Sequence, residues 1–284
     1  MKYLLILLFL VAQYTVGQNT SPFQIYNKKG KKISVNRFLK GLESCDVVLF
    51  GELHDNPMAH WLQLKATQHL HSMDTIALGA EMLESHNQKQ LNDYLNGLIS
   101  HDEFVDSSDL WINYKTDYKP LVDYAKQYNL AFIATNIPRK YASFVYRNGL
   151  EPLALELSDE EKSLVAPLPI AYDPELPGYK SMLNMMSDHS NPNFPKAQAI
   201  KDATMAHFIY AHYKKTGNQF IHFNGDYHSK NFEGIYWYLS RKDENLKITT
   251  ISTVEQENVK RLNDEYKGSA DFIIVVDEEM TKTY

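Results

Sequence analysis

The chain has 284 residues, of which 44% are hydrophobic and 23% charged, and it carries a formal net charge of −6. This composition is typical of a globular protein with a substantial core, and it excludes disordered and fibrous classes. The Lys and Arg residues are scattered and fewer than the Asp and Glu residues, so we expect no nucleic-acid partner.

The first stretch, MKYLLILLFLVAQYTVGQ, has the layout of a secretory signal peptide, with one Lys, an apolar run, and small residues at Thr15 and Gly17. The run is too short for an ordinary membrane span, and no later segment approaches the necessary length. We expect residues 1–17 to be removed and residues 18–284 to form one exported domain, in the periplasm or cell envelope. The single cysteine, Cys45, does not directly follow the apolar run, so we expect no lipoprotein cysteine.

The order of elements along the chain predicts an α/β fold. A hairpin is expected at 23–35 around Asn-Lys-Lys-Gly, and Asn36 is placed to cap a short helix that ends at Leu42. The later predicted strands are 46–51, 75–81, 130–135, 219–223, 246–251 and 271–276, and the helices are 57–71, 86–96, 120–129, 138–148, 196–215 and 230–240. Apolar strands that alternate with helices indicate a central, largely parallel β-sheet flanked by helices on both faces. The proline-rich middle predicts a helical insertion at about 150–195.

Polar side chains gather where the predicted strands end. They are Glu52, His54, Glu81, Asn136, His222, Asp226 and His228. In an open parallel sheet, ligands bind beyond the carboxyl ends of the strands, so we expect these side chains at one edge. Glu, His and Asp bind divalent metals and transfer protons.

Each of these residues also has a structural explanation. Asp55, Asn56 and Pro57 are typical of a helix start, and His60 is expected to face solvent. Glu81 alone is compatible with a helix cap or an ion pair, and His222 alone with a satisfied, half-buried histidine. Their convergence from several strands favours a functional site.

Further residues around this edge suggest the kind of ligand. Arg139 can hold an anionic group such as a carboxylate, or pair with a neighbouring Glu. The middle of the chain concentrates Tyr and Met, including Tyr172, Tyr179 and Met182, which suits the wall of a large, flat, apolar ligand. Phenolate is a known ligand of haem iron, whereas Met at helical spacing is also common in cores and dimer faces.

Six stretches of the chain, in order, resemble the ChaN-like haem-binding uptake proteins, which share a superfamily with Tiki and TraB-type proteins and erythromycin esterases. The stretches are VVLFGELHDNPMAH, IALGAEMLE, LNDYLNGLISHDEF, YKPLVDYAKQYNLAFIATNIPRKYASFVYRNGL, AQAIKDATMAHFI and FIHFNGDYHSKNFEGI. They extend over about residues 35–252. The resemblance implies a ChaN-like α/β domain.

For function, the resemblance implies haem bound through a tyrosine, a homodimer with stacked haems, and association with envelope haem or iron transport proteins. Tyr141 is our choice of iron ligand because it lies in a matched stretch at a strand exit, with Tyr179 and Tyr172 as alternatives. We expect Tyr141, His54, Arg139 and His228 to contact the haem.

Other branches of the superfamily carry a Gly-x-x-His motif, which matches Gly51 and His54 here. They imply a second hypothesis, a metal-dependent hydrolase of the peptidase or esterase type. The implied ligands of a zinc or manganese ion are His54, Glu81, His222 and His228. Glu52 would be the general base for a metal-bound water. A third hypothesis is a binding module without metal or haem.

Overall fold

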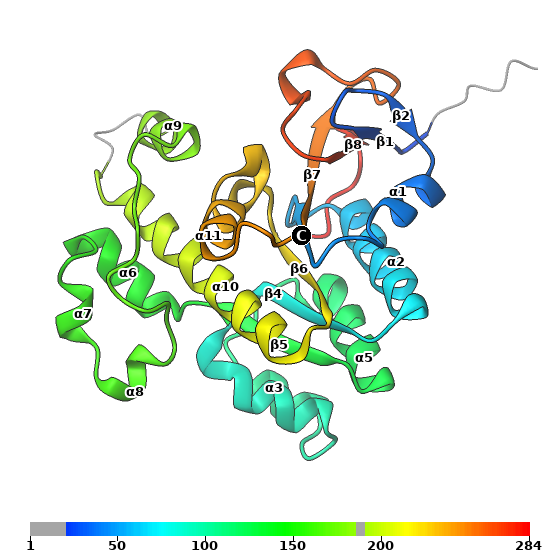
Figure 1. Ribbon diagram of the computed structural model, residues 1–284. Helices are drawn as coiled ribbons and strands as arrows, with labels where there is room; N and C mark the ends of the chain where they lie inside the picture. Colours follow the sequence, from blue (N-terminus) through cyan, green and yellow to red (C-terminus); the bar gives the residue numbers. More distant parts are fainter. Residues whose placement is uncertain (1–20, 186–190) are drawn as a thin grey trace, which may run out of the picture.

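The computed structural model describes residues 21–185 and 191–284, which build an eight-stranded sheet between layers of helices (Figure 1). Residues 1–17, the expected signal peptide, lie outside the described residues. The strands are β1 (Phe23–Asn27), β2 (Lys32–Ile33), β3 (Val47–Glu52), β4 (Ile76–Glu84), β5 (Ala131–Asn136), β6 (Gln219–Gly225), β7 (Ile248–Gln256) and β8 (Phe272–Asp277). The longer helices are α2 (Pro57–Met73), α3 (Gln88–Leu95), α5 (Lys119–Tyr128), α6 (Arg139–Asn148), α9 (Pro177–Met185), α10 (Phe194–Thr216) and α11 (Ile235–Lys242).

The sheet confirms the predicted α/β class. Six neighbouring strands, in the order β8-β7-β3-β6-β4-β5, run parallel. The β1–β2 hairpin adds to β8 in antiparallel pairing at one edge, and its turn uses Gly30 at φ 75°. Glycine adopts this left-handed conformation without the steric cost that a Cβ would add.

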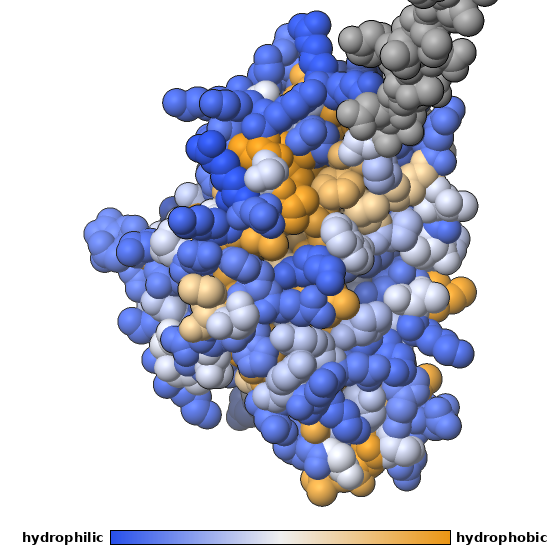
Figure 2. Space-filling view, turned by 90° about the vertical axis from the view of Figure 1, so that its right-hand side faces the viewer, coloured by the Kyte–Doolittle hydropathy of each residue, from blue (hydrophilic) through white to orange (hydrophobic). Residues whose placement is uncertain are grey.

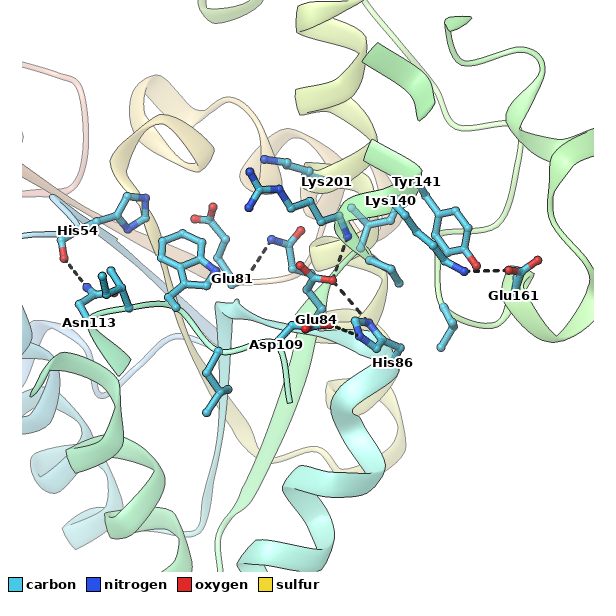
Figure 3. A pocket seen from close by; sticks show the side chains of 18 of the residues that line it. His54, Glu81, Glu84, His86, Asp109, Asn113, Lys140, Tyr141, Glu161 and Lys201 are labelled. Carbon is cyan, nitrogen blue, oxygen red and sulfur yellow. Dashed lines mark hydrogen bonds and ion pairs between the residues drawn. The ribbon is translucent and has the colours of Figure 1, made fainter. Parts of the chain in front are cut away.

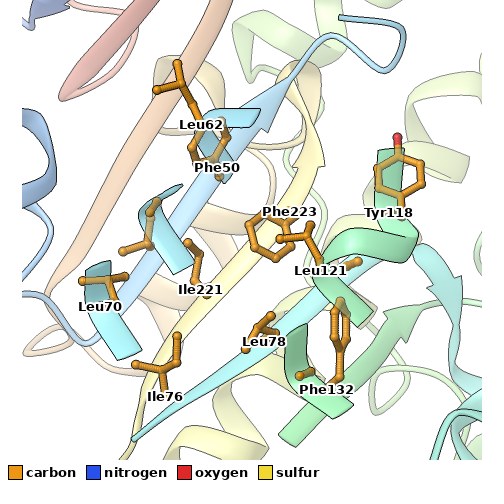
Figure 4. Packing of buried hydrophobic residues seen from close by; sticks show 14 of the residues in the cluster. Phe50, Leu62, Leu70, Ile76, Leu78, Tyr118, Leu121, Phe132, Ile221 and Phe223 are labelled. Carbon is orange, nitrogen blue, oxygen red and sulfur yellow. The ribbon is translucent and has the colours of Figure 1, made fainter. Parts of the chain in front are cut away.

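Helices cover both faces of the sheet, and alternate strand residues contact opposite layers. On one face, Phe50 and Phe223 pack beneath α2, α3 and α5 (Figure 4). On the other face, Leu49 and Phe220 pack beneath α10 and α11. Because side chains alternate between the two faces along a strand, the position of a polar residue in its strand decides which helix layer it contacts.

The connections after β3 and β6 diverge to opposite faces. β3 continues into α2 on one face, whereas β6 continues to α11 on the other, and the two strands are direct neighbours. A crevice opens at such a switch point beyond the strand ends. The topology alone thus places the residues after β3 and β6 side by side.

Several boundaries differ from the prediction for local reasons. Ser34, and not Asn36, caps α1 (Val35–Gly41) by accepting a hydrogen bond from the Arg37 N–H. β4 continues to Glu84, so Glu81 lies inside a strand. The short helix α4 (His101–Asp106) was not predicted, although Ser100 and Glu103 form a capping box that marks its start.

The described part of the predicted helical insertion before residue 186 contains three helices. They are α7 (Leu153–Glu156), α8 (Asp159–Lys162) and α9, and α7 and α8 lie beside α6 at one side of the molecule in Figure 1. Val145 and Leu153 join a separate apolar cluster with Ile200 of α10. The insertion is therefore anchored on α6 and α10, the two helices next to the strand ends.

The face shown in Figure 2 is mostly hydrophilic, with one apolar patch in its upper half. Among residues 21–185 and 191–284, no helix is both long and apolar enough to cross a membrane.

We expect Phe223→Ala to lower the free energy of unfolding by about 3–5 kcal/mol, because it empties a fully buried site at the centre of the sheet. Leu155→Ala is the control, since Leu155 is 92% exposed, and it should change stability by less than about 0.5 kcal/mol. Urea unfolding followed by circular dichroism measures both. Equal effects of the two substitutions would contradict the core assignment.

Candidate functional site

A cavity of about 1120 Å³ lies at the carboxyl ends of β3, β4 and β5 (Figure 3). Its wall includes His54, Glu81, Lys201 of α10, residues 109–113, and the start of α6. Figure 3 shows His54 at one end and Tyr141 at the other, with Glu81 and Lys201 between them. The volume exceeds the range of about 300–1,000 Å³ that is typical of small-ligand pockets.

At one end, His54 is held by a buried carboxylate. Its Nδ1 lies 2.9 Å from Glu52 Oε1, and Tyr118 donates to the same oxygen at 2.6 Å. Gln63 donates to the other Glu52 oxygen. In the neutral ring, Nδ1–H donates to Glu52 and the lone pair is on Nε2, which has no hydrogen bond among the described residues.

The electrostatics of this pair favour a protonated His54. Burial lowers the pKa of His54, but the hydrogen bond to Glu52 and the charges of Glu81 and Glu52 outweigh it and raise the pKa above its ordinary value. The imidazole therefore gains or loses its proton at a higher pH than a free histidine does.

His60 is buried, contrary to our expectation that it faces solvent. Its Nε2 lies 3.0 Å from the His54 carbonyl oxygen, and Nδ1 lies 3.2 Å from Gln63 Oε1. Asn113 Nδ2 also donates to the His54 carbonyl, at 2.9 Å. The backbone of the His54 loop is thus fixed by two side chains from different elements.

In the middle of the site, His228 lies between two buried carboxylates. Its Nδ1 is 2.5 Å from Asp202 Oδ1 and its Nε2 is 3.1 Å from Glu81 Oε1. Tyr179 donates to the second Asp202 oxygen at 3.1 Å, and the Gly225 N–H donates to Glu81 Oε2 at 2.8 Å. All three ionisable side chains are at most 7% exposed.

Burial opposes charge in this cluster; the ion pairs outweigh it at His228 and Glu81, whereas burial prevails at Asp202 and raises the pKa of that carboxyl. The charges of Glu81 and Asp202 raise the pKa of His228 to about 9. The imidazolium of His228 in turn lowers the pKa of Glu81. Glu81 is consequently a fixed anion on the floor of the cavity, and His228 is a buried cation beneath it.

The structure does not bring His222 to the cavity. It shares the face of Phe220 under α10, is fully buried, and has Nδ1 at 3.0 Å from Asn224 Oδ1 and Nε2 at 2.7 Å from Thr135 Oγ1. Burial lowers the pKa of His222 to about 4, so the ring is neutral. The structural alternative, a histidine whose ring nitrogens are satisfied by hydrogen bonds, therefore accounts for the contacts of His222.

His228 also does not line the cavity. Glu81 lies between the cavity and the His228 ring, and both ring nitrogens of His228 pair with carboxylates. The implied metal ligands His54, Glu81, His222 and His228 are therefore not assembled around one point. Among residues 21–185 and 191–284, no group of three or more His, Cys, Asp or Glu side chains is arranged to hold a metal ion.

Gly225 allows the two halves of the site to meet. A Cβ at this position would lie 2.7 Å from His54 Nε2 and 3.4 Å from Glu81 Oε2. The first distance is too short for any real contact, so a side chain here would displace the His54 ring.

At the other end, Tyr141 and Asn136 present unused polar atoms to the cavity. The Tyr141 hydroxyl and Asn136 Oδ1 are buried and make no hydrogen bond of ordinary geometry within the described residues, although the Glu161 carboxylate and the Lys140 ammonium lie near the hydroxyl. Asn136 Nδ2 donates to the Glu81 carbonyl at 2.9 Å, which orients Oδ1 away from that carbonyl. Both atoms belong to residues that line the cavity, so a ligand bound there would be placed to satisfy them.

Positive charge lies beside these atoms. Arg139 and Lys201 line the cavity, and neither has a carboxylate within 4 Å in the part of the chain that the structure describes. Lys140 pairs with Glu161 at 3.0 Å, and its ammonium lies 4.6 Å from the centroid of the Tyr141 ring. Glu84, Glu160 and Glu161 line the same end, so Arg139 and Lys201 are cations without an ion pair within a lining of mixed charge.

The alternative tyrosines lie elsewhere. Tyr179 is buried against Asp202, and Tyr172 stacks on Tyr179 with centroids 5.6 Å apart; neither lines the cavity. Three residues that sequence reasoning missed, Asp202, Lys201 and Trp111, come from a long helix and an irregular loop. These three residues do not follow a predicted strand, which is the pattern that identified the other site residues.

A family model described as "Haem-binding uptake, Tiki superfamily, ChaN" matches residues 38–239. No curated protein matches the chain.

Several solved structures are similar to this chain. ChaN of Campylobacter jejuni, described with cofacial heme binding, is 18% identical with a TM-score of 0.63, covering 90% of this chain and 97% of its own. A Bacillus cereus protein is 12% identical with a TM-score of 0.50, covering 89% and 94%. An erythromycin esterase, EreC, is 12% identical with a TM-score of 0.49, covering 90% and 83%.

The family match extends over most of the chain and includes β3, β4, β5 and β6, the strands whose ends form the site. The chain therefore belongs to the haem-binding uptake family of the Tiki superfamily, the ChaN family.

Proposed function

We propose that this protein is an exported haem-binding protein that serves haem or iron uptake or storage, and that it holds haem in the cavity between His54 and Tyr141. The observation that carries the proposal is the unpartnered, buried Tyr141 hydroxyl in a cavity of about 1120 Å³. Family membership supports the choice of ligand.

The residues fit a porphyrin in size and polarity. Leu110, Trp111, Ile112 and Ile137 give the cavity apolar and aromatic walls, which suit a large planar ring. Bound haem would supply an iron that a tyrosine phenolate can hold. Burial and the nearby Glu161 carboxylate raise the pKa of Tyr141, whereas the Lys140 ammonium acts in the opposite direction; an iron bound to the oxygen would stabilise the phenolate.

Arg139 and Lys201 would hold the carboxylates of the haem. Both cations line the cavity near Tyr141 without a carboxylate partner among the described residues. Ion pairs with a ligand would then replace the solvation that these side chains lose. His54, at the opposite end, would present its free Nε2 to the other part of the ligand.

Export and envelope association extend this proposal. Residues 1–17 have the composition of a signal peptide, and the family is one of haem uptake. A homodimer would cover a porphyrin edge that one cavity leaves exposed. Association with envelope haem or iron transport proteins would follow from such a role.

We expect Tyr141→Phe to abolish the Soret shift that the wild type shows on titration with hemin, because the variant keeps the ring but loses the iron-binding oxygen. Tyr146→Phe on the same helix is the matched control, since Tyr146 is 36% exposed and lies outside the cavity lining. His54→Ala should weaken binding without abolishing the shift. A wild type that gives no shift would refute the haem proposal.

We expect Lys201→Met and Arg139→Gln each to raise the Kd for hemin about 3- to 10-fold, as for a partly exposed charged hydrogen bond. The same titration with hemin dimethyl ester tests the reason for this loss, because the ester lacks the free carboxylates. Wild type and variants should bind the ester equally. If the variants lose the same factor with the ester, the cations do not bind the carboxylates.

A second candidate function is hydrolysis of an ester or peptide bond at the His54 end. The favouring observation is the Glu52–His54 pair, in which a buried carboxylate orients an imidazole whose Nε2 is free. A histidine held in this way can take a proton from water as a general base. The metal-dependent form of this hypothesis lacks an assembled ligand set among the described residues.

If the second function exists, hydrolysis of a p-nitrophenyl ester should increase as pH rises through the His54 pKa, because only the neutral imidazole accepts a proton. The midpoint should lie above 6.5, since the surrounding carboxylates raise this pKa. Glu52→Gln should shift the midpoint downward, and His54→Gln should abolish the pH-dependent rate. An unchanged pH-dependent rate in both variants would contradict this candidate function.

A further inference from the structure

The last residues of the chain lie against the His54 end of the cavity. Figure 1 places the C-terminus near the middle of the molecule, away from β8. The Thr283 N–H donates to the Asp55 carbonyl at 2.9 Å. Lys282 pairs with Glu255 of β7 and, at 3.5 Å, with Asp55. The segment is therefore attached to two separate parts of the sheet edge.

A third attachment is buried. Thr283 Oγ1 donates to Asp117 Oδ2 at 2.7 Å, and Asp117 is 4% exposed. Asp117 lies in the single π-helical turn Tyr114–Tyr118 that precedes α5. Asn113 Nδ2 donates both to Asp117 Oδ2, at 2.8 Å, and to the His54 carbonyl. One hydrogen-bonded chain thus runs from Thr283 to the backbone of His54.

The next residue reaches the cavity itself. Tyr284 is part of the cavity wall, together with His54 and Asn113, and is 60% exposed. Burial and the charges of Asp55, Asp117 and Glu52 raise the pKa of Tyr284, so its side chain is a neutral phenol. An accessible aromatic ring at this place offers a flat apolar surface to a planar ligand.

We propose that residues Lys282–Tyr284 form a strap that closes the His54 end of the cavity, and that Tyr284 provides a wall for the bound planar ligand. Residues outside helices and strands lose conformational entropy when they are ordered, so contacts must hold them in one place. Here two hydrogen bonds of Thr283 and two ion pairs of Lys282 hold the segment, and one of the hydrogen bonds ends on a buried carboxylate that also positions the His54 loop. The role of Tyr284 as a haem wall rests on the proposed function, whereas closure over His54 does not.

Closure is tested without any ligand, by the rate at which diethyl pyrocarbonate modifies His54. Peptide mapping separates the 11 histidines, and His69, far along α2, serves as the internal reference. Thr283→Val removes the hydrogen bond to Asp117 and should raise the relative rate at His54 about 2- to 10-fold. Thr281→Val is the matched control, because Thr281 is exposed and has no side-chain hydrogen bond among the described residues. Equal rates in the two variants would overturn the strap.

The wall is tested by hemin affinity. Tyr284→Ala should raise the Kd about 3- to 10-fold, whereas Tyr284→Phe, which keeps the ring, should bind as the wild type does. Tyr227→Ala is the control, since Tyr227 is 45% exposed and lies outside the cavity lining. Unchanged affinity of Tyr284→Ala would refute the wall. A wild type that binds no hemin would refute both the proposed function and the haem wall, while the His54 modification rates still decide closure.

Discussion

His228 is a buried cation between two buried carboxylates, and the geometry of the whole site depends on it. Glu81 and Asp202 come from a strand and a helix that are far apart in sequence, and the imidazolium joins them. Removing one partner of such a group leaves a buried charge without compensation, which typically costs about 3–5 kcal/mol. The same interaction fixes Glu81 as an anion on the cavity floor. The cluster therefore combines structural support with the electrostatics of the site.

Two layers of the protein meet at this point. Glu52 and His54 are supported from the α2 side by Gln63 and Tyr118, whereas Glu81 is supported from the α10 side through His228. They approach each other across the end of β6, which lies between β3 and β4, and Gly225 of β6 leaves room for the His54 ring. A switch point in the sheet makes this meeting possible, because the chain leaves β3 and β6 toward opposite faces.

The sequence predicted the parts of the site that depend on strand ends. Glu52, His54 and Glu81 lie at the predicted edge because apolar strands and their exits are local patterns. The sequence did not predict that His222 is fully buried. Strand alternation decides on which face of the sheet this side chain lies, and the sequence of one chain does not say which strands and helices surround that face.

Long-range packing explains the other differences. His60 has a polar helical context, yet the His54 loop and Gln63 enclose it. Asp202 and Lys201 occupy α10, whose position over the strand ends follows from a crossover of more than eighty residues after β5. Composition and periodicity carry no information about such contacts, so these residues could be found only in three dimensions.

The two candidate functions place their chemistry at opposite ends of one cavity. Hydrolysis of a small ester would need the Glu52–His54 end and would leave the Tyr141 hydroxyl, Asn136 Oδ1 and the cations near them without partners. Unsatisfied buried groups are costly, and a fold retains them where a ligand completes them. A ligand that extends from His54 to Tyr141, is flat enough for the aromatic walls and carries carboxylates for Arg139 and Lys201 satisfies both ends. These requirements describe a haem more closely than a small ester, which is why the arrangement of the whole cavity favours haem binding.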